Sequence, residues 1–151
     1  MALTLSPRPV ATPRDVSDFV ERNELVLPED YRKFLLTVNG GRCLTGGVFR
    51  SLQTHEKVSR VATVLGLSGP DYENLETNLG DLTGRIPAAS LPVAYDGGGN
   101  LLLLDCSQDQ ASNGKVYFLD LEATGGDVPR KEDLTLVALS FGNLLNGLDE
   151  D

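Results

Sequence analysis

Two apolar segments separated by a glycine-rich turn constrain this fold more than any other feature of the chain. Residues 91–95 read Leu-Pro-Val-Ala-Tyr, residues 101–104 are four consecutive leucines, and Asp-Gly-Gly-Gly-Asn stands between them at 96–100. Short apolar runs around such a turn predict a β-hairpin whose two strands are both largely buried. Glycine favours the turn because it adopts positive φ without a Cβ clash. The sequence therefore predicts a buried hairpin at the centre of the fold.

Two helices are predicted ahead of the hairpin. Thr12 is expected to N-cap the first, with Pro13 at its first position, and Asn23 is expected to end it. The second is expected to start at Pro28 and to end at Asn39–Gly40–Gly41, because Asn and Gly tolerate the left-handed conformation at a helix C-terminus. Both carry apolar residues at helical spacing, so we expect them to pack as a pair. These residues are Val16, Phe19 and Val20 in the first helix, and Tyr31, Phe34, Leu35 and Val38 in the second.

The remaining segments complete an α+β pattern. Residues 58–67 fit a helix or a strand, and residues 71–82 fit a weak helix or an ordered loop. Strands are predicted over 115–120 and 134–139, followed by a closing helix with Ser140 at its N-cap. Helices at both ends with consecutive hairpin strands between them predict a mostly antiparallel, curved sheet.

Length and charge limit the classes of function. The 151 residues suffice for one self-supporting core, which we expect over residues 12–151 after an irregular arm at residues 1–11. No apolar run approaches the roughly 20 residues of a membrane-spanning helix, and the N-terminus lacks a signal-peptide pattern, so the cytoplasm is the expected location. With 22 acidic and 13 basic residues the net charge is −9, which disfavours nucleic-acid binding. The charge suits a basic protein partner, or serves solubility alone.

The chain lacks the residues of common catalytic and metal centres. Its one histidine, His55, stands in a polar stretch typical of a solvated turn, and its two cysteines, Cys43 and Cys106, are far apart in sequence. Zinc sites and nucleophilic catalysis need more ligands or bases than these residues supply. We therefore expect reduced cysteines in or near the core, and neither a metal, a cofactor nor an enzymatic activity.

Two segments look at first like ligand-binding loops. The glycines at 97–99 lead into a strand and lack the Gly-Lys-Ser/Thr that a phosphate loop requires. Asp105, Asp109 and Asn113 depart from the spacing of a calcium loop. A tight hairpin turn and an exposed polar loop are the simpler interpretations of the two segments.

The order of these landmarks resembles the SMI/KNR-type branch of the SUKH superfamily over about residues 13–148. The resemblance is carried by a Leu-Pro-x-x-Tyr helix start, an Asn-Gly-Gly helix end, the Asp-Gly-Gly-Gly-Asn turn before an apolar strand, and the closing helix. The corresponding motif residues are Pro28, Tyr31, Asn39, Gly40, Gly41, Gly97, Gly98, Gly99 and Asn100. The lack of Trp and the pair Gly142–Asn143 in the closing helix depart from the family pattern and leave the subfamily open.

The resemblance implies a binding module rather than an enzyme. Bacterial members of the superfamily are typically immunity proteins, which bind and block the C-terminal domain of a polymorphic or contact-dependent toxin, often a nuclease or a deaminase. Fungal relatives regulate cell-wall synthesis and signalling through protein contacts. The expected function is therefore neutralisation of a cognate toxin domain, with a regulatory or scaffolding module as the alternative.

Acidic side chains near the hairpin are the candidate contacts for such a partner. Asp96, Asp105 and Asp109 lie on the hairpin or in the loop after it, and Asp120 and Glu122 follow the next strand. A toxin that acts on nucleic acid needs a basic cleft, where carboxylates can take the place of phosphate charge. Each of the five also fits a solvated surface charge, and Asp96 and Asp105 also fit turn and strand-end acceptors. The sequence leaves the oligomeric state open.

Overall fold

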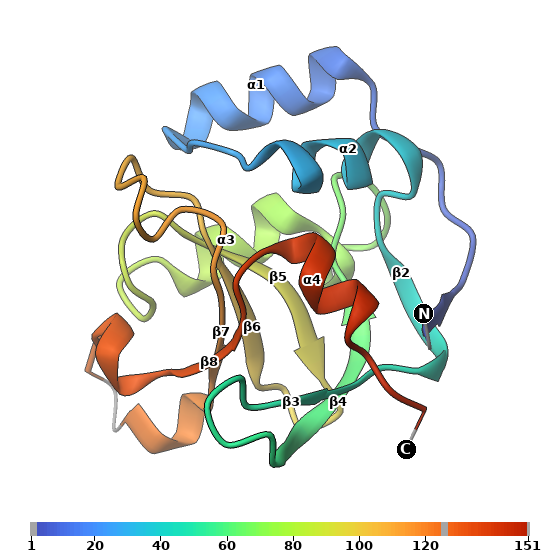
Figure 1. Cartoon of the computed structure of the whole chain (residues 1–151). Helices are drawn as coiled ribbons and strands as arrows, with labels where there is room; N and C mark the ends of the chain where they lie inside the picture. Colours follow the sequence, from blue (N-terminus) through green and yellow to red (C-terminus); the bar gives the residue numbers. More distant parts are fainter. Residues whose placement is uncertain (1–2, 125–126, 151) are drawn as a thin grey trace.

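Antiparallel strands form the centre of the computed structural model, which describes residues 3–124 and 127–150 (Figure 1). The strands are β1 (Leu3–Leu5), β2 (Gly41–Gly46), β3 (Val48–Arg50), β4 (Lys57–Val64), β5 (Ser90–Asp96), β6 (Leu101–Asp105), β7 (Val116–Leu119) and β8 (Thr135–Ala138). Their order in the sheet is β1-β2-β4-β5-β6-β7-β8, and β3 pairs with β4 beside that path. The predicted α+β class with a mostly antiparallel, curved sheet is confirmed.

The predicted hairpin consists of β5 and β6, in the middle of the sheet. Every residue of β6 is buried, as the run of four leucines predicts. The Asp96 N–H donates to the Asn100 carbonyl at 2.9 Å and closes the turn. Among the three glycines between them, Gly99 alone has a positive φ, of +82°. The conformational freedom of glycine is therefore required at one of the three positions.

Helices pack on the sheet and close the core. They are α1 (Pro13–Asn23), α2 (Glu29–Thr37), α3 (Leu75–Leu82) and α4 (Phe141–Asn146), with short 3-10 turns η1 (Asp71–Glu73), η2 (Leu121–Thr124) and η3 (Lys131–Asp133). Side chains of β6 alternate between two clusters, because successive residues of a strand point to opposite faces. Leu102 and Leu104 join the larger cluster with α1, α2 and α4, whereas Leu101 and Leu103 join a smaller one with the end of α3.

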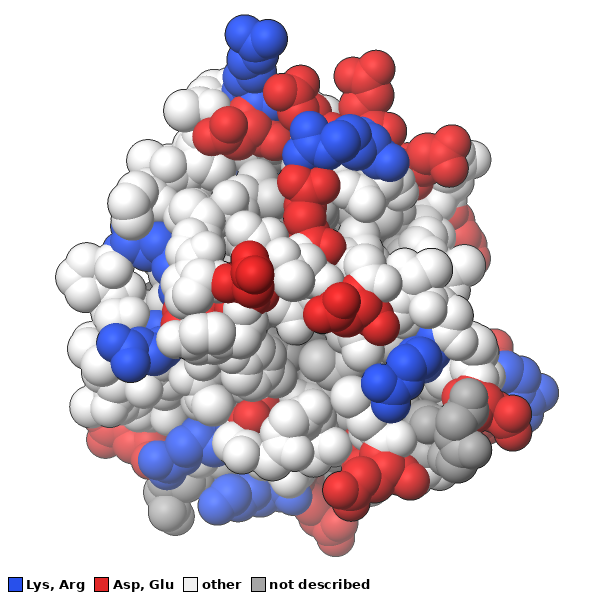
Figure 2. Space-filling model, turned by 180° about the vertical axis from the view of Figure 1, so that it is seen from behind, with Lys and Arg blue, Asp and Glu red and all other residues white. Residues whose placement is uncertain are grey.

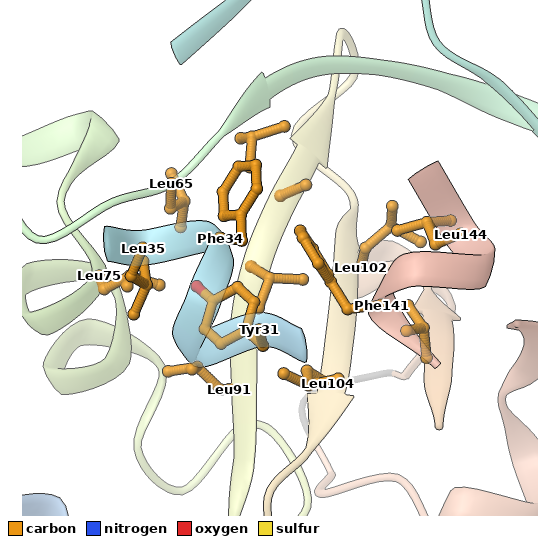
Figure 3. Close-up of a cluster of buried hydrophobic side chains, with 14 of the residues drawn as sticks. Tyr31, Phe34, Leu35, Leu65, Leu75, Leu91, Leu102, Leu104, Phe141 and Leu144 are labelled. Atoms are coloured by element: carbon orange, nitrogen blue, oxygen red, sulfur yellow. The ribbon is translucent and has the colours of Figure 1, made fainter. Parts of the chain in front are cut away.

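Three aromatic side chains fix α2 and α4 against each other over the sheet (Figure 3). The Phe141 ring of α4 meets the rings of Tyr31 and Phe34 edge-on, with both centroid distances at 4.8 Å. Edge-to-face contacts at this distance are favourable because the positive edge of one ring meets the negative face of the other. Tyr31, one of the residues that carry the family resemblance, is therefore a core residue.

The helix starts follow the sequence closely. Thr12 and Asp15 form a capping box at the start of α1, in which each side chain accepts a hydrogen bond from the other residue's backbone N–H. Pro28 stands in extended conformation at the N-cap position of α2, which begins at Glu29, and makes no side-chain capping hydrogen bond. Val38 follows the last residue of α2 and is 39% exposed, so the prediction that it faces the core is wrong. The helix ends one residue too early to carry Val38 onto the buried stripe.

The segments with two interpretations take definite structures. Residues 57–64 form the strand β4, and residues 71–82 divide into η1 and α3. The Asn74 side-chain oxygen caps α3 by accepting from the N–H groups of Glu76 and Thr77. The Ser140 hydroxyl accepts from the Asn143 N–H at 3.0 Å, which confirms the predicted N-cap of α4.

The N-terminal arm is partly regular, which corrects the prediction of an irregular segment over residues 1–11. Leu3–Leu5 pairs with β2, and the Arg8 guanidinium forms an ion pair with Glu73 in which both side chains are more than nine-tenths buried. The Ala11 N–H also donates to the Leu35 carbonyl at 3.0 Å. These partners lie far along the chain, so no local pattern reveals them. Met1 and Ala2 of the arm, and Asp151 at the other end, lie outside the described residues.

Asn39 and the two glycines after it form a junction between three segments. The buried Asn39 amide donates to the Pro9 carbonyl at 2.9 Å, and its oxygen accepts from the Leu67 N–H at 2.9 Å. A Cβ on Gly40 would lie 2.5 Å from the Val64 carbonyl oxygen, and one on Gly41 would lie 2.4 Å from the Ser6 carbonyl oxygen. The Asn-Gly-Gly motif is needed because the backbones approach too closely for a side chain.

Candidate partner-binding surface

Asp96 lies at the end of β5 and is 7% exposed. Its carboxylate accepts hydrogen bonds from the Ser59 hydroxyl at 2.8 Å and from the N–H groups of Gly98 and Asn100 at 2.9 and 2.8 Å. Burial raises the pKa of Asp96, but these bonds favour the ionised form and outweigh it, so the pKa lies below its ordinary value. Asp96 therefore stabilises the turn, the second of the two roles predicted for it, while its contact with a partner stays a prediction.

Asp105 ends β6 and is 1% exposed. The Lys131 ammonium donates to Asp105 Oδ2 at 2.5 Å, and the hydroxyl and N–H of Ser107 donate to Oδ1 at 2.6 and 2.9 Å. Burial raises the pKa of Asp105, and the bonds from Lys131 and Ser107 more than reverse that effect. This carboxylate therefore ties η3 to the central hairpin, in keeping with its predicted role as a strand-end acceptor, and its contact with a partner stays a prediction.

Asp109, Asp120 and Glu122 are exposed, as a contact to another protein requires. Asp109 lies in the loop after β6, Asp120 directly follows β7, and Glu122 belongs to η2. One carboxylate oxygen of Asp109 accepts from the Ala111 N–H, and one of Asp120 accepts from the Glu122 N–H, both at 3.0 Å. A carboxylate accepts several hydrogen bonds, so these local bonds orient the side chains and leave room for a partner's donor.

Two neighbouring grooves carry Asp109 and Asp120 and meet at Leu134. The first, which we name the β7 groove, has a volume of about 430 Å³ and contains Asp120. The second, which we name the Tyr117 groove, has a volume of about 490 Å³ and contains Asp109. Phe118 and Leu119 lie in the first, and Tyr117 and Leu136 in the second. Both therefore combine buried or half-buried apolar side chains with exposed carboxylates.

Three further carboxylates line these grooves that the sequence analysis did not single out. Asp127 and Asp133 line the β7 groove, and Glu132 lines the Tyr117 groove. A short charged run in the sequence, Arg-Lys-Glu-Asp at 130–133, is the signal that points to two of them. The sequence of such a short run does not predict which way its side chains point, because the run belongs to no long helix or strand with a regular periodicity. Only the folded chain places them beside Asp109 and Asp120.

We refer to the exposed carboxylates around the two grooves as the acidic rim. The acidic rim consists of Asp109, Asp120, Asp127, Glu132 and Asp133, whereas the exposed Glu122 of η2 lines neither groove. Arg130 lies among them and pairs with Asp133 at 3.3 Å and with Glu132 at 3.9 Å, while Lys131 is engaged by the buried Asp105. The local charge therefore remains strongly negative.

Charge elsewhere on the molecule is mixed. Figure 2 shows acidic and basic side chains interspersed over the side seen from behind. Examples of local pairing are Arg22 with Glu76 at 2.5 Å and Arg50 with Asp149 at 3.1 Å. The net charge of −9 is therefore not spread as one uniform field, and a partner is attracted through local groups such as the acidic rim.

The described part of the chain contains no grouping of metal-binding side chains. No group of three or more His, Cys, Asp or Glu residues is arranged to hold a metal ion within residues 3–124 and 127–150. His55 is exposed in a turn. Asn113, considered for a calcium loop, uses its amide to donate to the carbonyls of Val26 and Ser107.

Both cysteines are free thiols. Burial raises the pKa of Cys43 and raises that of the fully buried Cys106 further. A thiol held in its neutral form is a poor nucleophile, so both behave as small apolar side chains. Among the described helices, none has the length and apolar character to cross a lipid bilayer.

Comparison with known families adds the relationship that the fold alone does not give. A family model described as the SMI1 / KNR4 family (SUKH-1) matches residues 10–147. The chain belongs to this family. No curated protein matches it. The SUKH-1 match covers α1 through α4, and so includes the acidic rim and all of the motif residues from Pro28 to Asn100.

The structure separates two kinds of residue in this SUKH-1 chain. Pro28, Tyr31, Asn39, Gly40 and Gly41 cap a helix, fill the core or allow close backbone contact. At the hairpin turn, Gly97, Gly98, Gly99 and Asn100 surround the buried Asp96 carboxylate. These motif residues maintain the fold, whereas the acidic rim is exposed and has no comparable structural task.

Proposed function

We propose that this SUKH-1 protein is an immunity protein, which binds a cognate toxin domain in the cytoplasm and blocks it sterically and electrostatically. The family supports a role in protein binding. The observation that carries the proposal further is the acidic rim, where five exposed carboxylates line two grooves that also contain half-buried apolar side chains. A toxin that binds nucleic acid presents a basic cleft to its substrate, and carboxylates are attracted to the same cleft.

The protein acts by binding, not by catalysis, in this proposal. Neutralisation requires that it occupy the toxin's active cleft or cover a surface beside it. Charged groups at such an interface speed association and exclude wrong partners, while the apolar floor of the grooves contributes affinity as water is displaced. Both contributions are available from the acidic rim and the grooves that it surrounds.

Co-expression with a toxic C-terminal domain, taken from a toxin gene found next to the gene of this chain, tests the proposal. We expect survival of cells that make both proteins, and co-purification of a stable complex. Death of the cells, with an active toxin and a soluble SUKH-1 chain that does not bind it, would reject immunity for that pair and favour the regulatory alternative. A purified chain that hydrolysed nucleic acid or nucleotides would contradict binding as its sole activity.

A further inference from the structure

The β7 groove is bounded by two segments of the chain. One wall is the end of β7, where Leu119 gives way to Asp120, and the other is the chain from Asp127 to Thr135. Phe118 and Leu134 are half-buried along it. Val128, at its edge, is 49% exposed. The groove therefore offers apolar surface that the protein's own side chains leave uncovered.

Carboxylates stand on both walls of this apolar groove. Asp120 belongs to the β7 wall, and Asp127 and Asp133 belong to the opposite one. All three are exposed. Arg130 pairs with Asp133 at 3.3 Å, but both side chains are more than half exposed, so this ion pair contributes little and is readily exchanged. The electrostatics favour a cation that enters between the walls.

We propose that the β7 groove receives an arginine side chain from an extended segment of the partner protein. The methylene stem of arginine covers apolar surface while its head stays polar, which matches a groove with Leu134 and Phe118 inside and carboxylates at the rim. The planar guanidinium has five N–H donors and pairs with carboxylates in a two-pronged geometry that lysine lacks. An aliphatic neighbour in the same segment would cover Val128.

The inference rests on the proposed function only in naming the chemistry that the partner presents. A toxin that acts on nucleic acid carries arginine where it contacts phosphate. If Asp120 and the neighbouring carboxylates paired with such an arginine, the arginine could no longer contact the toxin's substrate. The same chemistry applies to any other partner with an exposed arginine between aliphatic residues.

The test uses the whole chain and two short peptides as probes. Acetyl-Leu-Arg-Leu-amide is titrated into the ¹⁵N-labelled protein, and the same peptide with citrulline in place of arginine is the neutral, isosteric control. We expect amide chemical-shift changes centred on Leu119, Asp120, Leu134 and Thr135, and binding of the citrulline peptide that is weaker by roughly fivefold or more. Changes centred elsewhere, equal binding of both peptides, or no change at millimolar peptide would overturn the inference.

Matched variants separate the groove from overall charge. Asp120→Asn removes one carboxylate from the β7 groove, and Asp18→Asn removes an exposed one from α1, a helix that contributes no residue to the groove. Asp120→Asn is expected to weaken binding of the arginine peptide roughly threefold or more, whereas Asp18→Asn is expected to leave its affinity unchanged. Equal weakening by both would show a general charge effect and reject the groove.

The outcome is independent of the test of immunity. A chain that binds the arginine peptide in the β7 groove but fails to protect cells from the neighbouring toxin retains the inference and loses the proposed function. If the wild type protects cells, and the wild type, Asp120→Asn and Asp18→Asn all bind the toxin with equal affinity, the proposed function is retained and the inference is lost.

Discussion

Asp96 and Asp105 are carboxylates that the chain can bury because hydrogen bonds replace the water that they lose. Asp96 is held by a hydroxyl and two backbone N–H groups, and Asp105 by a serine and the Lys131 ammonium. In both, the bonds to the ionised form outweigh burial and lower the pKa. Their folded-state pKa values therefore lie below the unfolded value of about 4.

This shift makes the stability of the protein depend on pH in a defined direction. A carboxylate with a lowered folded pKa stabilises the protein above its unfolded pKa, and the contribution is lost as the pH falls through the folded pKa. Asp105→Asn should lower the free energy of unfolding by about 2–4 kcal/mol at pH 7. The difference from wild type should shrink as the pH falls below about 4, the unfolded pKa of the carboxyl group.

Urea denaturation of both proteins at several pH values measures this effect. Asp18→Asn is the control, because the Asp18 side chain is half exposed and its loss should change stability by less than about 0.5 kcal/mol at any of these pH values. A constant difference between wild type and Asp105→Asn from pH 7 to pH 2 would show that ionisation of Asp105 does not contribute.

Tyr31 is a buried polar residue of the opposite kind. Its hydroxyl has no hydrogen-bond partner among the described residues, and burial raises its pKa well above the ordinary value. Tyr31→Phe keeps the ring contacts with Phe34 and Phe141 and removes the unpaired group. We expect the free energy of unfolding to stay equal or to rise by about 1 kcal/mol, measured by thermal or urea unfolding. A loss of that size would show that the hydroxyl is hydrogen-bonded in solution.

Elements far apart in sequence meet at positions where a side chain would not fit. A Cβ on Gly66 would lie 1.9 Å from the Asn39 carbonyl oxygen, whereas one on Gly97 would meet no heavy atom within 4 Å. Gly66→Ala should therefore cost at least about 3 kcal/mol or prevent folding, because backbone must move. Gly97→Ala should change stability by less than about 0.5 kcal/mol. Unfolding curves and soluble yield compare the two, and similar values would contradict the close approach.

The ion pair between Arg8 and Glu73 fastens the N-terminal segment to the turn η1. Removing one partner leaves the other charge buried and unpaired, so Arg8→Met should cost about 3–5 kcal/mol. Replacing both residues by methionine should recover most of that loss, since no charge then remains inside. Chemical denaturation of the single and double variants tests this. If the double variant were as unstable as the single one, the loss of stability would come from lost packing instead of from an unpaired buried charge.

At the scale of the whole molecule, the distribution of the net charge of −9 over the surface matters most for binding. Basic residues pair with acidic ones over much of the surface, while the acidic rim keeps most of its charge. Such a distribution accelerates encounter with a basic partner more than it adds to final affinity. The charge and the apolar grooves thus have separate effects, on association and on dissociation.

Salt separates these two effects. In a complex with a basic toxin domain, we expect the association rate constant to fall about tenfold or more between 50 mM and 500 mM NaCl, with a smaller change in dissociation, because ions screen exposed charges. Stopped-flow or surface-plasmon kinetics measures both. Asp120→Asn should reduce the salt dependence of association, and Asp18→Asn should not. An association rate independent of salt would contradict electrostatic attraction through the acidic rim.

The sequence by itself determined the local elements of this protein. The capping box at Thr12 and Asp15, the cap at Ser140 and the hairpin around 96–100 all depend on residues within a few positions of one another. Their hydrogen bonds and steric limits are therefore written in short patterns. The order of these patterns also indicated the family, which the match over residues 10–147 shows.

The tertiary structure alone decided which carboxylates are buried and which can meet a partner. Asp105 is buried because Lys131, 26 positions later, reaches it, and the strand Leu3–Leu5 exists because β2 lies beside it. The same folding gathers Asp109, Asp120 and Asp133 around two adjoining grooves. A charged side chain has the same local pattern whether it becomes a buried acceptor or an exposed contact. Its role follows from long-range packing, because only packing fixes how much water and which donors surround it.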